Sequence, residues 1–366
     1  MKERILLVGE STFEKGGLQT VIMSIVRCLH TYYTFDLLLF TDQKGYYDDE
    51  FISYGGTIFQ FPKSSNKTIR KISNYFNYIL YYYKTKRLIK ENGNYKAIHC
   101  HNGIDALPFI MAAKIMAIPI RIVHSHVVYK NNHAFFTRKI IDKLLRLGLK
   151  RNSTAFIGCS DIACVSMFGN KIRSQIVPNS YNEKLFNQKL YARALFTAPI
   201  LIQIGSFSDL KNQLYTLRIF SEVLKTYPDS KLHFVGFDLD NYKYRIENYI
   251  NENGLEESVI LHPCDADTPY LLSQSSHYIQ PSRSESFAIV LLEAQAMGLR
   301  CLVSDVVPTI SNCGGCEYLS IDVEPSIWAT FIIDDFKKTK GKAHQWDCSN
   351  FTQNNISELY HKLYTS

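Results

Sequence analysis

The stretch that runs from Gln280 to Gly298 reads Gln-Pro-Ser-Arg-Ser-Glu-Ser-Phe-Ala-Ile-Val-Leu-Leu-Glu-Ala-Gln-Ala-Met-Gly. Good helix formers begin near Ser286 and stop at Gly298, so the pattern predicts a strand, a loop and a helix. Free N–H groups in the first turn of such a helix favour a phosphate. Glu285 and Glu293 flank that position, and ionised carboxylates suit the paired hydroxyls of a sugar or ribose. The stretch therefore predicts a site for a sugar nucleotide.

The same stretch resembles the Glu-x7-Glu signature of retaining glycosyltransferases of family 4. That resemblance implies an α/β fold of the GT-B kind, with two facing Rossmann-like domains and a cleft between them. It also implies that Glu285 contacts the donor sugar, that Glu293 holds the ribose, and that the backbone of Ser286-Phe287-Ala288 meets the diphosphate. Taken alone, two Glu at this spacing are typical of a solvated helix face, so other parts of the chain must support the assignment.

Length and composition set the broad class of the protein. The chain has 366 residues, of which 46% are hydrophobic and 20% charged, which is typical of a globular protein large enough for two domains. The apolar run Ile5–Val8 is too short for a signal peptide, and no stretch approaches the roughly 20 apolar residues of a membrane span. Nine scattered cysteines, an odd number, favour a reducing compartment. We therefore expect a cytoplasmic protein.

The charge is divided unevenly along the chain. Residues 1–188 carry 26 Lys or Arg and 13 Asp or Glu, whereas residues 189–366 carry 15 and 21. We expect an N-terminal acceptor-side domain at 1–182, a linker at 183–198 and a nucleotide-sugar domain at 199–349, with a last helix at about 350–366 that crosses back, as GT-B proteins often have. The basic half suits an anionic membrane face or a diphosphate-bearing acceptor; partial domain pairing and simple solvation stay as alternatives.

The first loop of the chain carries a pair of glycines. A buried strand at 4–9 is followed by Lys15-Gly16-Gly17 and then by an apolar-periodic helix at 18–29. Glycines at such a turn let backbone amides approach a ligand, although a plain tight turn has the same sequence. The resemblance assigns Gly16 and Gly17 to the donor phosphates. The Gly-x-Gly-x-x-Gly fingerprint of dinucleotide-binding proteins does not occur.

A long basic segment, Lys63–Lys96, combines nine Lys or Arg and one acid with interleaved aromatic residues. This pattern is found at nucleic-acid and membrane surfaces, but in a helix packed on a sheet the aromatic residues are more often core. The segment 136–151 is basic as well. Because no sequence-specific nucleic-acid motif accompanies these charges, we expect no nucleic-acid partner, and a helix packed on the sheet and a membrane surface stay as alternatives.

Two His-x-His pairs end strands of the first domain: His99 and His101, then His124 and His126. Because alternate side chains of a strand point to opposite faces, we expect only one histidine of each pair to reach the ligand end of the sheet, and we expect no metal site. The resemblance, in which a His-Ser-His sequence ends this strand, assigns His126 to the reacting centre. His101 is a weaker, acceptor-side candidate.

The second domain begins with a strand at 200–205 that ends in Gly205-Ser206. The family commonly has an Arg directly after this Gly and a Lys a few residues later, both of which bind the donor diphosphate. Lys211 fits the second position, whereas Ser206 replaces the Arg, so Arg283 is a candidate to compensate. Gly236, at the end of the next strand, is expected to let the backbone approach the nucleotide. Cys313-Gly-Gly-Cys316 lacks the second cysteine pair of a zinc site and is interpreted as a glycine turn.

The resemblance extends over nearly the whole chain and implies a retaining hexosyl- or N-acetylhexosaminyl-transferase without an obligatory metal or other cofactor. The expected substrates are a nucleotide sugar, with UDP preferred, and a glycan hydroxyl, for example on a lipid-linked intermediate of capsular, exo- or O-antigen polysaccharide synthesis. The catalytic candidates are His126, Glu285 and Lys211.

Three other functions compete with that of a transferase. A GT-B UDP-sugar epimerase and a non-catalytic nucleotide-sugar-binding subunit stay open. A glycosidase needs two carboxyl groups across the scissile bond, which Glu285 and Glu293 are ill suited to provide.

Overall fold

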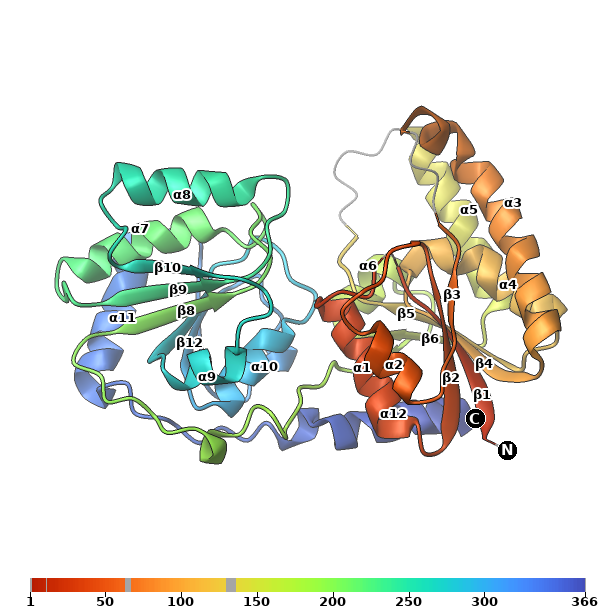
Figure 1. Cartoon of the computed structure of the whole chain (residues 1–366). Helices are drawn as coiled ribbons and strands as arrows, with labels where there is room; N and C mark the ends of the chain where they lie inside the picture. Colours follow the sequence, from red (N-terminus) through yellow and green to blue (C-terminus); the bar gives the residue numbers. More distant parts are fainter. Residues whose placement is uncertain (1, 11, 63–66, 130–135, 366) are drawn as a thin grey trace. The chain divides into compact units, whose positions relative to one another are not determined.

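The structure is a computed structural model that describes residues 2–10, 12–62, 67–129 and 136–365, without the side chains of 67–76 and 136–139. The chain forms two compact units, each built on its own sheet (Figure 1). Unit 1 comprises Met1–Asn179 and Gln353–Ser366, and unit 2 comprises Ser180–Thr352. The segment that we expected to be a linker, 183–198, is thus grouped with unit 2, and the last helix with unit 1.

Unit 1 contains a parallel sheet in the order β3-β2-β1-β4-β5-β6-β7, so the strand order reverses between β1 and β4. Its strands are β1 (Glu3–Val8), β2 (Tyr33–Leu39), β3 (Ile58–Gln60), β4 (Tyr95–Cys100), β5 (Ile120–Ser125), β6 (Ala155–Gly158) and β7 (Gln175–Ile176). Its helices are α1 (Gly17–Leu29), α2 (Asp48–Ser53), α3 (Lys67–Asn92), η1 (Gly103–Ala106), α4 (Leu107–Ile115), α5 (Phe136–Asn152), α6 (Asp161–Phe168) and α12 (Gln353–Thr365).

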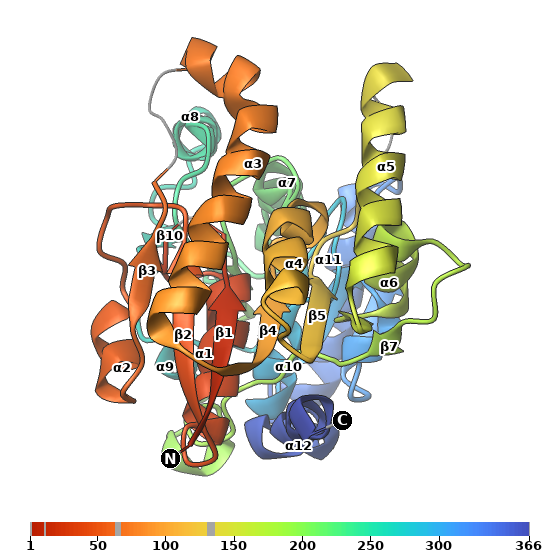
Figure 2. The same cartoon turned by 90° about the vertical axis from the view of Figure 1, so that its right-hand side faces the viewer.

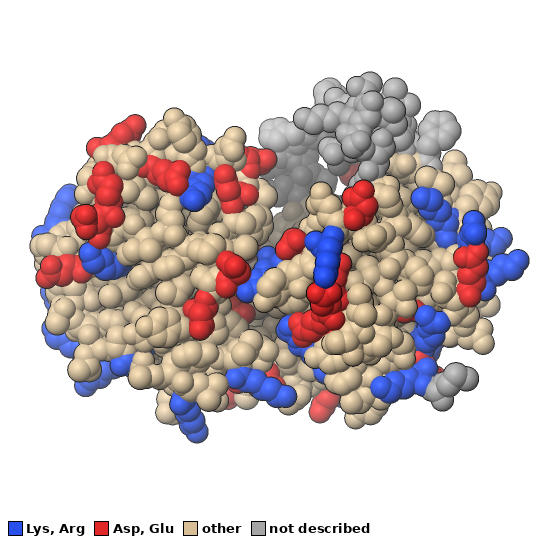
Figure 3. Space-filling model, viewed as in Figure 1, with Lys and Arg blue, Asp and Glu red and all other residues tan. Residues whose placement is uncertain are grey.

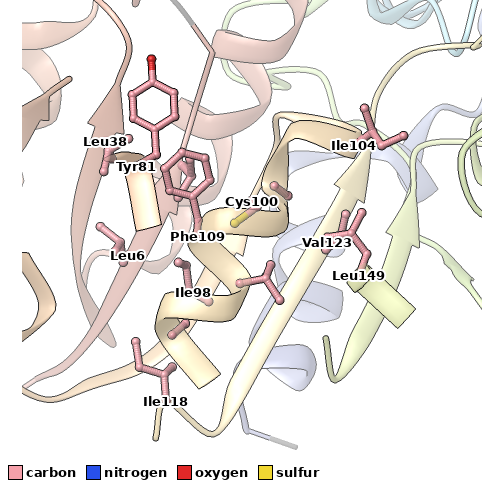
Figure 4. Packing of buried hydrophobic residues seen from close by; sticks show 14 of the residues in the cluster. Leu6, Leu38, Tyr81, Ile98, Cys100, Ile104, Phe109, Ile118, Val123 and Leu149 are labelled. Atoms are coloured by element: carbon pink, nitrogen blue, oxygen red, sulfur yellow. The ribbon is translucent and has the colours of Figure 1, made fainter. Parts of the chain in front are cut away.

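One face of this sheet is covered by α3, α4 and α5, which lie side by side (Figure 2). Alternate strand residues such as Leu6, Ile98 and Val123 point into the core beneath these helices (Figure 4). Tyr81 of α3 and Phe109 of α4 stack in the same core with ring centroids 5.8 Å apart. The expectation that aromatic residues of the basic segment serve as core is confirmed for Tyr81. Two further aromatic residues of the segment, Tyr75 and Phe76, lie outside the described side chains.

The opposite face of the sheet holds the four histidines of the two His-x-His pairs. The rings of His99 and His101 stack with centroids 4.1 Å apart, and those of His124 and His126 lie 3.8 Å apart. We expected only one histidine of each pair to face the ligand-binding side of the sheet. That expectation was wrong, because residues two apart in a strand point to the same face. Helix α12 covers this face, where the Tyr364 hydroxyl lies 2.8 Å from His99 Nδ1.

Unit 2 repeats the architecture with a parallel sheet in the order β10-β9-β8-β11-β12-β13, which reverses between β8 and β11. Its strands are β8 (Ile200–Ile204), β9 (Lys231–Val235), β10 (Val259–His262), β11 (His277–Gln280), β12 (Arg300–Ser304) and β13 (Cys316–Leu319). Its helices are η2 (Gln188–Leu190), α7 (Gln213–Leu224), α8 (Tyr242–Glu252), α9 (Thr268–Ser273), α10 (Ile289–Ala296), η3 (Thr309–Ser311), α11 (Pro325–Thr339) and η4 (Ser349–Phe351).

The predicted α/β class with two Rossmann-like sheets is confirmed. One predicted helix starts later than expected: α10 begins at Ile289 and not near Ser286. Ala288 precedes the helix in a left-handed conformation (φ 69°), so the chain turns sharply after Phe287, whose side chain is buried. A left-handed backbone is unusual for a residue with a Cβ, which is why helix propensity alone misplaced this end.

The buried histidines predict that unit 1 loses stability in acid. Burial lowers the pKa of His99 and His126 to about 3, and it lowers the pKa of His101 and His124 as well. Because the unfolded chain takes up these protons below its ordinary histidine pKa of about 6.5, unfolding becomes easier as the pH falls below that value. Each histidine should cost roughly 1 kcal/mol between pH 7.5 and pH 5.5, or about 4–5 kcal/mol together.

Urea unfolding at the two pH values tests this prediction. Circular dichroism follows both units, whereas tryptophan fluorescence follows unit 2, because Trp328 and Trp346 both lie there. The transition seen by circular dichroism but not by fluorescence should move to lower urea in acid, and it should move less in a His124→Gln variant. An acid shift equal in both proteins would contradict the assignment to the histidines.

Candidate functional site

Two loops of unit 2 meet where the strand order reverses. The first follows β8 and contains Gly205, Ser206 and Lys211; the second follows β11 and contains Arg283 and Glu285. The sequence-predicted donor residues of these loops are therefore brought together at the carboxyl end of the sheet, which is the usual ligand-binding position in open α/β sheets.

Lys211 and Glu285 form an ion pair with Nζ to Oε1 at 2.5 Å. The same carboxylate oxygen accepts hydrogen bonds from Gln280 Nε2 and Ser282 Oγ, both at 2.7 Å. The Glu285 side chain is only 9% exposed. Its second oxygen, Oε2, accepts no hydrogen bond from the residues that the structure describes. Three donors thus fix the carboxylate through one oxygen and leave the other available to a ligand.

The backbone of Lys211 is held in place as well. Gln203, on β8, donates from Nε2 to the Lys211 carbonyl at 2.7 Å, while its Oε1 accepts from Thr216 Oγ1. The Lys211 stem passes Gly205, where a Cβ would lie 3.4 Å from Lys211 Cε. Gly205 has φ 152° and would be strained with a side chain. The predicted glycine is thus explained by backbone conformation and by the close passage of the lysine.

Gly236 has a packing role. A Cβ on this residue would lie 2.1 Å from the Gly205 carbonyl oxygen, so the ends of β8 and β9 can approach only with glycine at this position. The predicted contact of Gly236 with the nucleotide is not tested by this geometry. The glycine is needed in any case to let the Gly205 loop lie against β9.

Asn212 ties the two loops together. It lies in a left-handed conformation (φ 59°), and its Nδ2 donates to the Pro281 carbonyl at 3.0 Å. Its Oδ1 accepts from Arg283 Nη2 at 3.3 Å. Arg283 Nε also lies 3.7 Å from Asp209 Oδ2 in an ion pair with two exposed partners. Arg283 therefore lies beside the loop that carries Ser206, the position where the family commonly has an Arg.

Ser286, Phe287 and Ala288 connect Glu285 to α10, which begins at Ile289, and no side chain caps the helix. The N–H groups of the first turn have no acceptor within the helix itself. Their dipoles and the nearby Lys211 ammonium favour an anion at this position.

Glu293 lies inside α10. Its carboxylate makes no hydrogen bond or ion pair with the described residues, and its side chain is half-buried. Burial raises the pKa of Glu293 to about 8. A half-buried carboxyl group that the described residues leave unpaired is available to bind hydroxyl groups.

In unit 1, Gly16 and Gly17 lie at the start of α1. Gly16 precedes the helix in an extended conformation, and a Cβ there would lie 2.5 Å from Gln19 Oε1, the end of a flexible side chain. A Cβ on Gly17 would meet no atom within 4 Å. Packing therefore does not demand a glycine at position 17, and the space beside it is open.

The four histidines of the two His-x-His pairs are linked by hydrogen bonds between their rings. His99 Nε2 lies 3.2 Å from His124 Nδ1, and His101 Nδ1 lies 2.9 Å from His126 Nε2. All four have lowered pKa values through burial, so all are neutral at pH 7. Of the predicted pair, His101 is buried and His126 is half-buried at the end of β5.

His99, His101 and His124 form the group of potential metal ligands that the described residues offer. Both nitrogens of His99 already have partners, namely Tyr364 and His124. The His99 and His101 rings stack with their planes 29° apart, so their in-plane lone pairs run side by side. This arrangement is better suited to hydrogen bonding within the cluster than to one ion.

Sequence reasoning missed Gln203, Asn212, Gln280 and Ser282. Each of them holds Lys211, Glu285 or Arg283 in place through a hydrogen bond. Gln280 and Ser282 were visible as polar residues at a strand end, whereas the contact of Gln203 with Lys211 depends on loop geometry. Tyr364 was missed as the partner of His99 for the same reason.

A family model described as glycosyl transferases group 1 matches residues 193–313, which include both loops of the unit 2 site. The putative glycosyltransferase EpsF of Bacillus subtilis is 25% identical over 88% of this chain and 85% of its own length. The capsular polysaccharide biosynthesis glycosyltransferase CapH of Staphylococcus aureus is 22% identical over 96% of both chains. An Escherichia coli UDP-Gal:alpha-D-GlcNAc-diphosphoundecaprenol alpha-1,3-galactosyltransferase is 22% identical over 60% of both.

Among solved structures, Anabaena Alr3699/HepE in complex with UDP and glucose has a TM-score of 0.77 and 15% identity, with 99% of both chains covered. At this identity the likeness shows the fold alone. The resemblance stated from the sequence is confirmed: the chain has the GT-B fold, a glycosyl transferases group 1 segment, and glycosyltransferase relatives that include one of capsule synthesis.

The raised pKa of Glu293 predicts a loss of stability of unit 2 at alkaline pH. Between the ordinary glutamate pKa of 4.5 and about 8, the folded protein keeps a proton that the unfolded chain releases. Stability therefore falls as the pH rises through this window, by roughly 2–4 kcal/mol for a half-buried group. Urea unfolding by tryptophan fluorescence should show this loss between pH 6 and pH 9, and a Glu293→Gln variant should lack most of it. Parallel curves for the two proteins would contradict the burial of Glu293.

Proposed function

We propose that this protein is a retaining glycosyltransferase that moves a hexosyl or N-acetylhexosaminyl group from a nucleotide sugar to a hydroxyl of a glycan acceptor. The observation that carries the proposal is the pair of carboxyl groups at the unit 2 site. Glu285 is fixed through Oε1 with Oε2 available, and Glu293 has no partner in the described chain. In the proposal, Glu285 accepts hydrogen bonds from the donor sugar and Glu293 from the ribose.

The diphosphate would lie between these two groups. Lys211 uses one of its three N–H donors on Glu285, so two are available to phosphate oxygens. The first-turn amides of α10 supply further donors next to Ser286-Phe287-Ala288. Such pre-oriented positive groups stabilise the charge that grows on the leaving diphosphate. In the proposal Arg283, beside the Ser206 loop, contributes the charge that Ser206 cannot.

The choice of UDP as the donor nucleotide is supported by the descriptions of one structural neighbour and one relative. HepE is described in complex with UDP and glucose, and the Escherichia coli relative is named for UDP-Gal. We propose that the acceptor is a lipid-linked intermediate of surface polysaccharide synthesis, for which the name of the E. coli enzyme, with its diphosphoundecaprenol acceptor, is the support.

Unit 1 is proposed to supply His126 to the reacting centre, His101 to the acceptor side, and the Gly16-Gly17 amides to phosphate oxygens. At pH 7 both histidines are neutral, so they would act by hydrogen bonding and not as cations. The proposal requires no metal ion, since Lys211 and helix amides provide the positive charge. No helix of the described chain is long and apolar enough to cross a membrane.

A panel of UDP-, GDP- and ADP-sugars, assayed for release of the nucleoside diphosphate, tests the proposed function. One donor should be cleaved. Lys211→Gln should lower kcat by about 100-fold or more, because it removes a charge that acts on the leaving group. Glu293→Gln should mainly raise KM, since a ribose contact is shared by substrate and transition state. The exposed Glu252→Gln of α8 is the matched control and should behave as the parent protein.

Two outcomes would change this conclusion. Donor binding, seen as a shift in melting temperature, without release even in the presence of lipid extract would indicate a non-catalytic subunit. Release of an epimerised nucleotide sugar would indicate an epimerase. Product analysis by NMR tests retention, because an inverted anomeric centre would contradict a retaining transferase.

Gly17→Ala separates a ligand role of the first loop from a structural one. The new methyl group meets open space and alanine is the better helix former, so the melting temperature should stay equal or rise slightly. If donor phosphates approach this backbone, the KM for the donor should rise about tenfold, which corresponds to roughly 1.4 kcal/mol. Unchanged kinetics would show that Gly17 does not lie beside the donor.

A further inference from the structure

The outward side of α3, α4 and α5 exposes an unusual number of large apolar side chains. On α5, Leu144 is 61% exposed, and Ile140 and Leu147 are exposed on the same side, one turn before and one turn after it. We define the outer helix face by the exposed apolar residues of the three helices, which are Ile79, Leu80, Tyr83, Met111, Ile115, Ile140, Leu144 and Leu147. Exposed apolar residues gathered in this way mark an interaction surface.

The outer helix face is also strongly basic. In the parts of α3, α4 and α5 whose side chains are described, 9 residues are Lys or Arg and 2 are Asp or Glu. Of the two acids, Glu91 pairs with Arg87 at 2.7 Å and Asp142 is half-buried. Lys and Arg side chains line the edge of unit 1 where the lower part of α3 lies (Figure 3). The positive charge is therefore largely uncompensated within the three helices.

The three helices form one continuous layer. They lie side by side on the sheet (Figure 2), and Lys114 of α4 donates from Nζ to the carbonyl of Arg151 in α5 at 3.0 Å. Apolar and basic side chains of neighbouring helices can therefore contact one extended partner at the same time.

We infer that the outer helix face binds an anionic lipid surface. Aliphatic side chains flanked by Lys and Arg match the interface of a membrane with anionic headgroups, where the former enter the acyl boundary and the latter meet phosphates. A second copy of this chain is a poor partner, because two faces with this excess of positive charge repel each other. Nucleic acid would satisfy the charges but would leave Ile140, Leu144 and Leu147 in contact with a polar backbone.

The inference deepens the proposed function, on which it rests for the lipid-linked acceptor. It names the surface by which the protein would approach such an acceptor. Vesicle binding is measured without any sugar, so a failure here and a failure of donor cleavage are distinguishable.

Co-sedimentation with vesicles tests the inference. The full chain should bind vesicles of phosphatidylglycerol and phosphatidylcholine at low salt and should bind much less to phosphatidylcholine alone or at high salt. Lys143→Gln with Lys150→Gln should weaken binding about 25-fold, or about fivefold per lysine. Leu144→Ser with Leu147→Ser should weaken it by at least tenfold. The matched control, Ile327→Ser with Phe331→Ser, changes two exposed apolar residues of α11 in unit 2 and should bind as the parent chain does.

Donor cleavage should be unchanged in the α5 variants, which shows that they fold. Three results would overturn the inference: no binding to anionic vesicles at low salt, equal losses in the α5 and α11 variants, or a concentration-dependent dimer in light scattering that the α5 substitutions abolish. Tighter binding to duplex DNA or RNA than to vesicles would overturn it as well.

Discussion

The ion pair between Lys211 and Glu285 is the interaction on which the arrangement of the unit 2 site depends. Each partner comes from a different loop, and each loop leaves a strand at the point where the sheet order reverses. Removing water from the 9% exposed Glu285 carboxylate is costly, and the lysine together with two neutral donors offsets that cost. Because all three donors use one oxygen, the stabilising contacts and the ligand-facing oxygen are separated within a single carboxyl group.

The second carboxyl group of the site, Glu293, lacks the internal donors that hold Glu285. Glu293 is half-buried without a partner among the described residues, and burial raises its pKa to about 8. A group in this condition lowers stability when it is charged, so it is retained at the expense of folding. Ribose hydroxyls would donate to the carboxylate and favour its charged form. The fold therefore maintains one carboxylate that is satisfied internally and one whose best partner is a ligand, which is the asymmetry expected of a binding site.

Much of the fold followed from the sequence because its strands are continuous apolar runs and its helices have clear periodicity. The start of α10 was misplaced since Ala288 adopts a left-handed backbone that propensity does not predict. The four histidines were misjudged because a strand's period of two places His99 and His101 on the same face. Gln203, Asn212 and Tyr364 could not be foreseen, because their hydrogen bonds join segments whose approach depends on the tertiary structure.

The histidine cluster shows how the last helix becomes part of unit 1. Tyr364, two residues before the chain end, reaches His99, which in turn reaches His124, whose ring lies 3.8 Å from that of His126. A buried imidazole with an unpaired nitrogen is costly, so this chain of contacts requires α12 to be in place. Neutral rings so closely packed cannot all take up protons. The histidine cluster is therefore built jointly by β4, β5 and α12, whose Tyr360 and Tyr364 lie against His99 and His124.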